Sequence, residues 1–179
     1  MKLVKKLLTF VPTLLLIAGF ALIIYVGASV RKGSVPKLFG YSFLIVITDS
    51  MEPTYNINEF IIIHEQNEYV VGDAVTFYYD YYENSHLVPV THRIDEITDQ
   101  VYTMVGDNPD YATKTQEITK DQIIGKVVGH SVFLGNIFSS PILQNKQILF
   151  AIITILLVLF IIYQMITIFK LFKSKEEKK

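Results

Sequence analysis

The chain has 179 residues and no cysteine, and 51% of its residues are apolar. This length suits one compact domain with anchors, and the lack of cysteine excludes disulfide bonds and thiolate zinc sites. Residues 31–146 contain 15 acidic and 8 basic residues, a net charge of −7. Because nucleic acids attract basic surfaces, this balance argues against a nucleic-acid partner.

Two long runs without charge lie near the ends of the chain, at residues 7–30 and 147–169. Each is long enough for a transmembrane helix, which needs about 20 residues to cross the hydrocarbon core. The first run exceeds the roughly 7–15 apolar residues of a signal peptide, so we expect an uncleaved anchor, with a removed leader as the alternative. The interior of the chain, residues 31–146, is then a domain between two transmembrane helices.

The lysines of the tail, residues 170–179, indicate the orientation. Cytoplasmic segments next to a span are enriched in Lys and Arg. We therefore expect both termini, residues 1–6 and 170–179, in the cytoplasm and residues 31–146 outside. The predicted location is the plasma membrane or an equivalent membrane, with the lipid bilayer as a permanent partner.

The middle region alternates short apolar runs with turn residues. The runs are rich in Val, Ile, Phe, Tyr and Thr, which is typical of strands, and they cover residues 43–48, 60–64, 74–79, 88–94, 101–105 and 123–133. Turn residues separate them, as at Val71-Gly72-Asp73 and Asp107-Asn108-Pro109. We therefore predict a mainly β fold, a small antiparallel barrel or pair of packed sheets.

Ser50 is the candidate nucleophile. It follows the predicted strand 43–48 and precedes Met51 and Pro53, which are expected to stiffen the next turn. A serine hydroxyl is a poor nucleophile until a base removes its proton, and a serine in a turn is ordinary by itself. The hypothesis therefore depends on finding a base.

His92 is the best candidate among His64, His86, His92 and His130. It lies in a predicted strand between polar neighbours, and an imidazole with a pKa near 6.5 can accept a serine proton at neutral pH. A lysine is the rival base, but no lysine occurs between Lys37 and Lys114. The histidines show no short metal-binding spacing, so zinc hydrolysis is disfavoured and we expect no metal.

A base of this kind needs a carboxylate to orient its ring, and a developing oxyanion needs hydrogen-bond donors. Asp107 and Asp110 follow His92 across one predicted strand, at a distance typical of a hairpin. The Ser50 amide is the first oxyanion donor, and the Thr48 hydroxyl is a second. An ordinary turn at 106–109 and a plain strand residue at 48 are the alternative interpretations.

These residues together resemble signal peptidase I. The matching segments occur in order between residues 41 and 135, namely Ser50-Met51-Glu52-Pro53, Val71-Gly72-Asp73-Ala74-Val75, Thr91-His92-Arg93-Ile94, Gly106-Asp107-Asn108 and Gly125-Lys126-Val127-Val128-Gly129. A histidine in the base segment is similar to the endoplasmic-reticulum-like branch, which is also found in archaea and some Gram-positive bacteria. The resemblance assigns Ser50 as nucleophile, His92 as general base, and Asp110 or Asp107 as the acid, with Asp110 similar to the second aspartate of that branch.

The resemblance also implies a substrate and a mechanism. Exported preproteins would be cut after small side chains through an acyl-enzyme on Ser50, without a cofactor. Four tyrosines, Tyr78, Tyr79, Tyr81 and Tyr82, are candidates for an aromatic belt at the membrane interface, or else pack within the β domain. Two other classes remain open: a non-catalytic membrane-anchored binding or assembly module, and a related autoproteolytic or lipid-face hydrolase.

Overall fold

The computed structural model describes residues 2–80 and 87–176. Two of the four tyrosines of the predicted aromatic belt, Tyr81 and Tyr82, lie outside these residues, as does His86. The contacts divide the chain into two units, one made of Val26–Ser140 and one made of Met1–Tyr25 with Pro141–Lys179. Each unit is described by itself below.

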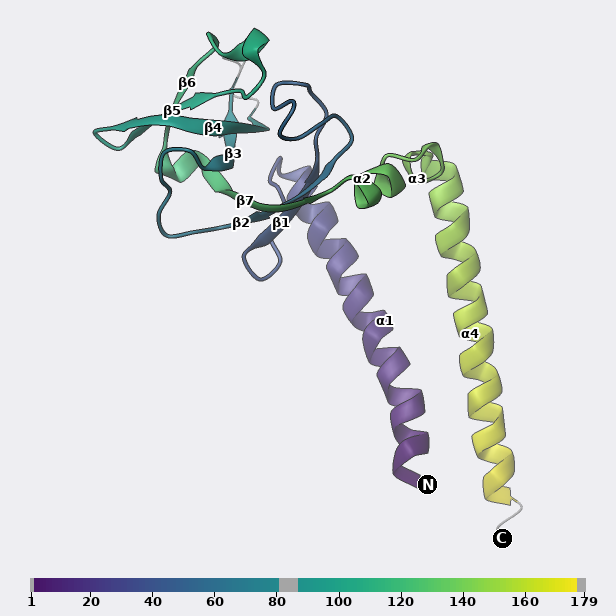
Figure 1. Ribbon diagram of the computed structural model, residues 1–179. Helices are drawn as coiled ribbons and strands as arrows, with labels where there is room; N and C mark the ends of the chain where they lie inside the picture. The colour runs from purple at the N-terminus through teal and green to yellow at the C-terminus, as the bar shows by residue number, and fades with distance from the viewer. Residues whose placement is uncertain (1, 81–86, 177–179) are drawn as a thin grey trace. The chain divides into compact units, whose positions relative to one another are not determined.

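The β-rich unit is a seven-stranded antiparallel sheet with the order β1-β2-β7-β3-β4-β5-β6 (Figure 1). The strands are β1 (Tyr41–Ile45), β2 (Phe60–His64), β3 (Ala74–Tyr79), β4 (Val88–Thr98), β5 (Val101–Val105), β6 (Gln116–Thr119) and β7 (Ile123–Ser131). Two 3₁₀ turns, η1 (Pro109–Tyr111) and η2 (Lys120–Gln122), flank β6. The mainly β antiparallel fold predicted from the sequence is confirmed.

The sheet differs in detail from the predicted barrel or pair of sheets. In the described part of the chain, all seven strands belong to one sheet, and its order ends at β1 and β6. The register shifts between Ile62 and Ile63 in β2, between Thr76 and Phe77 in β3, and between Ile94 and Glu96 in β4. Because β-bulges bend a sheet, a single sheet can enclose apolar side chains without closing.

The core has two apolar clusters, and the central strand β3 contributes to both. Val75 and Phe77 belong to the first, whereas Ala74 belongs to the second. The remaining buried members of the first are Tyr69, Ile94, Tyr102, Met104, Ile118 and Ile123. Those of the second are Met51, Ile61, Ile63, Ile124 and Val127. Met51, the residue after Ser50, is therefore anchored in the second cluster.

The other unit contains α3 (Pro141–Gln144), most of α1 (Lys2–Arg31), and α4 (Lys146–Glu176). Within α1 and α4, the segments Phe10–Arg31 and Gln147–Thr167 are long and apolar enough to cross a membrane. The short helix α2 (Val132–Phe138) belongs to the β-rich unit and follows β7 directly. Ser131 caps α2, since its hydroxyl accepts a hydrogen bond from the Leu134 amide at 3.2 Å.

Candidate active site

Ser50 lies in the turn that follows the first strand, and its neighbour Met51 fixes that turn. Met51 is 2% exposed in the second core cluster. The Glu52 amide donates to the Asp49 carbonyl at 3.0 Å, and the Tyr55 amide donates to the Met51 carbonyl at 2.9 Å. Ser50 itself is buried. A buried apolar side chain and two backbone hydrogen bonds therefore hold the hydroxyl of Ser50 in a defined place.

The turn of Ser50 docks on the loop that follows β5. The Asn108 amide donates to the Ser50 carbonyl at 3.0 Å, and the Asn108 side chain donates to the Asp49 carbonyl at 3.0 Å. The Tyr111 hydroxyl donates to the Asp49 carboxylate at 2.8 Å. A Cβ at Gly106 would lie 2.5 Å from the Ser50 carbonyl oxygen, so only glycine permits this approach.

The side chain of Thr48 lies next to the hydroxyl of Ser50. The two hydroxyl oxygens are 3.3 Å apart, and either one can donate. Thr48 is exposed, whereas Ser50 is buried. A hydroxyl beside the nucleophile can donate a hydrogen bond to a developing oxyanion. The structure thus brings together the two residues that the sequence predicted as nucleophile and oxyanion donor.

His92 lies in β4 and is 3% exposed. Its Nδ1 atom is 2.6 Å from the Oε1 atom of Gln116, and its ring meets the edge of the Phe77 ring at a centroid distance of 6.2 Å. Burial lowers the pKa of His92, while the hydrogen bond to Gln116 and the charge of Asp107 partly oppose that shift. The imidazole is therefore neutral at physiological pH, as a general base must be.

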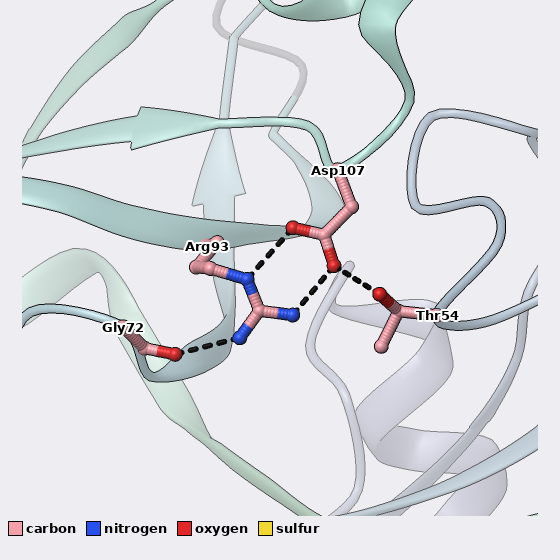
Figure 2. Close-up of polar contacts among 4 residues, drawn as sticks. All are labelled: Thr54, Gly72, Arg93 and Asp107. Carbon is pink, nitrogen blue, oxygen red and sulfur yellow. Dashed lines mark hydrogen bonds and ion pairs between the residues drawn. The ribbon is translucent and has the colours of Figure 1, made fainter.

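Arg93, the neighbour of His92, forms a two-point ion pair with Asp107 (Figure 2). Its Nε and Nη2 atoms donate to the two carboxylate oxygens at 2.7 and 2.5 Å. Its Nη1 atom donates to the Gly72 carbonyl at 2.6 Å, and the Thr54 hydroxyl donates to Asp107 at 2.5 Å. Guanidinium and carboxylate match in this geometry, which gives strong, directional hydrogen bonds.

The charges in this cluster stabilise one another. Burial alone would raise the pKa of Asp107, but the hydrogen bonds from Arg93 and Thr54 outweigh it and lower that pKa. The hydrogen bonds to Asp107 raise the pKa of Arg93 further above its usual range. Asp107 is therefore a carboxylate at neutral pH, and its negative charge acts on His92.

Asp107 joins the two halves of the site. Its carboxylate bonds at once to Thr54, four residues after Ser50, and to Arg93, the neighbour of His92. The backbone of the same loop bonds to the Ser50 carbonyl through Asn108. The segment that carries the candidate nucleophile and the strand that carries the candidate base are thus held against one loop.

Asp110 and Gln116 are placed differently from the sequence-based interpretation. Asp110 lies in η1, where its amide donates to the Asn108 side chain at 3.1 Å. Within residues 2–80 and 87–176, its carboxylate has no hydrogen-bond partner. The Nδ1 partner of His92 is Gln116, which the sequence does not single out because it lies in a short polar segment with no motif.

The His, Asp and Glu side chains of the described residues are the possible metal ligands. Among the described residues, no group of three or more His, Asp or Glu side chains lies close enough together to hold a metal ion. Glu59 and His130 form a separate pair, in which the Nδ1 of His130 lies 2.9 Å from the Glu59 carboxylate. Two residues of this kind are fewer than a protein zinc site uses.

Comparison with known proteins agrees with the site. The model of the peptidase S24-like family matches residues 29–128, which contain the turn of Ser50, the strand of His92 and the loop of Asp107. The chain belongs to the peptidase S24-like family. It is also similar to signal peptidase I W of Bacillus subtilis (strain 168), with 33% identity over 135 residues, or 70% of this chain and 67% of that protein. This S24-like chain is therefore a serine peptidase related to signal peptidases, and its two apolar helices indicate a membrane protein.

Proposed function

We propose that this chain removes N-terminal signal peptides from exported preproteins, with Ser50 as nucleophile and His92 as general base. The observation that carries the proposal is the bonding of Asp107 to both Thr54 and Arg93, since it fixes the nucleophile segment and the base strand together. The proposed enzyme is therefore of the Ser-His-Asp, endoplasmic-reticulum-like type. The proposed orientation has residues 31–146 outside the cytoplasm and both termini inside it.

In the first half of the reaction, the Oγ of Ser50 attacks the scissile carbonyl carbon while His92 accepts the hydroxyl proton. The negative oxygen of the tetrahedral intermediate receives hydrogen bonds from the Ser50 amide and the Thr48 hydroxyl. The carbon–nitrogen bond then breaks, His92 protonates the leaving amine of the mature protein, and the signal peptide remains as an ester on Ser50. In the second half, His92 takes a proton from water as the water attacks the ester carbonyl. The bond from that carbon to Ser50 Oγ then breaks, His92 returns the proton to Oγ, and the signal peptide leaves as a carboxylic acid.

The acid of the proposed triad is Asp107, because it binds Arg93, the neighbour of His92, and its charge acts on His92. The carboxylate of Asp110 makes no hydrogen bond within residues 2–80 and 87–176. Asp110 is the alternative acid on the strength of its match to the family pattern. Lysine is the rival base, and two lysines of the domain have other partners. Lys126 is 2.5 Å from the Asp73 carboxylate, and the Nζ of Lys114 lies 4.8 Å from the centroid of the Tyr111 ring.

The test is preprotein cleavage by the full chain reconstituted in lipid vesicles. Ser50→Ala should reduce cleavage by at least about 10³-fold, since it removes the nucleophile. Ser42→Ala is the matched control, because Ser42 is also buried but its hydroxyl has no hydrogen-bond partner in the described structure. Cleavage by Ser50→Ala at the rate of Ser42→Ala would refute the proposal. Binding of the preprotein without any cleavage by the wild type would favour the non-catalytic module.

A further inference from the structure

The side-chain amide of Gln116 has a defined orientation. Its Nε2 atom donates to the Lys114 carbonyl at 3.2 Å, and a carbonyl oxygen can only accept. The other end of the amide, Oε1, is therefore the atom that faces His92, at 2.6 Å from Nδ1. Gln116 is 7% exposed and His92 is 3% exposed, so water does not compete strongly for this bond.

This orientation determines where the proton of the neutral imidazole lies. Two acceptors cannot form a hydrogen bond, so Nδ1 of His92 must carry the proton that Gln116 Oε1 accepts. The lone pair then lies on Nε2, the ring nitrogen that a serine base uses. We infer that Gln116 is the positioning residue of His92, an uncharged amide in the place where a serine triad has its carboxylate. The inference rests on the proposed function, in which His92 is the base.

The register of the sheet explains why a residue so distant in sequence reaches His92. Ile94 pairs with Met104, and Met104 pairs with Gln116, so the three side chains share one face of the sheet. His92 lies two residues before Ile94 and points to the same face. Gly106, which follows the last residue of β5, carries no side chain that could take the place beside His92.

The arrangement divides two tasks that one aspartate performs in a Ser-His-Asp triad. Gln116 holds the ring and its tautomer, while Asp107 supplies negative charge from a position where Arg93 binds both of its oxygens. An uncharged acceptor stabilises an imidazolium less than a carboxylate does, since charge-assisted hydrogen bonds are roughly twice as strong. With an amide and not a carboxylate as its partner, the His92 ring therefore stays unprotonated in mildly acidic conditions.

Kinetics of Gln116→Leu and Gln116→Glu in the full chain test the inference. Gln116→Leu removes the acceptor, so kcat should fall by about 10- to 100-fold with little change in KM, because substrate contacts are untouched. Gln116→Glu keeps an acceptor and adds a charge. It should recover kcat relative to Gln116→Leu and move the acidic limb of the kcat/KM profile to higher pH. A purely structural role for Gln116 would not move that limb.

Gln122→Leu is the matched control for loss of an amide in the same sheet region. Gln122 bonds to the Thr119 amide and the Tyr78 carbonyl, away from His92. It should leave kcat and the pH profile within about twofold of the wild type, as expected of a change outside the site. Gln116→Leu with a wild-type kcat, or Gln116→Glu with an unmoved acidic limb, would overturn the inference.

A second measurement needs no turnover. In ¹⁵N-histidine-labelled Ser50→Ala protein in detergent micelles, the ring nitrogens of His92 should show a protonated Nδ1 and an unprotonated Nε2 at neutral pH. That signature should weaken when Gln116→Leu is added. The opposite tautomer would overturn the inference. If the tautomer is as expected but Ser50→Ala still cleaves preproteins, the proposed function fails while the assigned geometry stands.

Discussion

Two histidines of the β-rich unit have opposite surroundings. His92 is buried and its Nδ1 meets the neutral amide of Gln116, whereas the side chain of His130 is 51% exposed and its Nδ1 meets the carboxylate of Glu59. If the hydrogen-bond partner were the only criterion, His130 would resemble the base of a serine triad more than His92 does, because its partner is a carboxylate. Only His92, however, neighbours the residue that Asp107 holds against the segment of Ser50. Connection to the segment of Ser50, and not the histidine–carboxylate bond alone, is therefore the reason for proposing His92 as the base.

The largest expected effect is on cleavage by paired histidine variants. His92→Gln should reduce kcat/KM by about 10³-fold or more, since the general base is lost, and His130→Gln should change it by less than about twofold. Both variants remove an imidazole and keep a side chain capable of hydrogen bonding, so they are matched. Initial rates on one preprotein in vesicles measure both. An equal loss of kcat/KM in the two variants would contradict the assignment of different roles to the two histidines.

The next effect compares the two candidate acids. Asp107→Asn removes the charge that pairs with Arg93, and it should lower the free energy of unfolding by roughly 2–3 kcal/mol, somewhat less than a fully buried pair because Arg93 is one-third exposed. Asp110→Asn should change stability by less than about 0.5 kcal/mol, as is usual at exposed sites. Urea unfolding of the full chain in detergent measures both values.

Activity of the same pair assigns the acid. Asp107→Asn should also slow cleavage, because the segment of Ser50 and the strand of His92 lose their common partner and His92 loses a nearby negative charge. Asp110→Asn should cleave at nearly the wild-type rate. A larger loss of cleavage in Asp110→Asn than in Asp107→Asn would transfer the acid role to Asp110.

The strands that the sequence predicts best are those with a simple apolar pattern. The predicted segments 60–64, 74–79 and 101–105 match β2, β3 and β5, since β-branched and aromatic residues fill them and turn residues end them. The predicted strand 123–133 instead ends at Ser131. Its last two apolar residues, Val132 and Phe133, are helical in α2, because the Ser131 side chain caps a helix at that point.

The sequence predicted less of the site's internal bonding. Strand β6 has only four residues, of which only Ile118 is apolar, so its pattern is too short to distinguish a strand from a loop. The sequence around Gln116, the first residue of β6, therefore did not indicate a site residue. It meets His92 only because β4, β5 and β6 pair in a particular register, which is a long-range property. Arg93, next to His92, showed no charge pattern that would link it to Asp107.

The smallest expected effect concerns the pair formed by His130 and Glu59. Burial would raise the pKa of Glu59, but hydrogen bonds from Asn56 and His130 outweigh burial, so the pKa is lower in the folded chain than in the unfolded one. Its contribution to stability is therefore complete above the unfolded pKa, about 4.3, and disappears as the pH falls through the folded pKa. Glu59→Gln should lower the free energy of unfolding by about 1–2 kcal/mol at pH 7.

The difference between wild type and Glu59→Gln should then shrink towards pH 3.5, where the wild-type carboxylate takes up a proton. Glu117→Gln is the matched control, since Glu117 is exposed on β6 and its substitution should change the free energy of unfolding by less than about 0.5 kcal/mol. Cleavage near neutral pH should persist in Glu59→Gln, because among the described residues this pair makes no hydrogen bond to Ser50, His92 or Asp107. A loss of cleavage as large as that of His92→Gln, with the fold intact, would instead place Glu59 and His130 in the catalytic machinery.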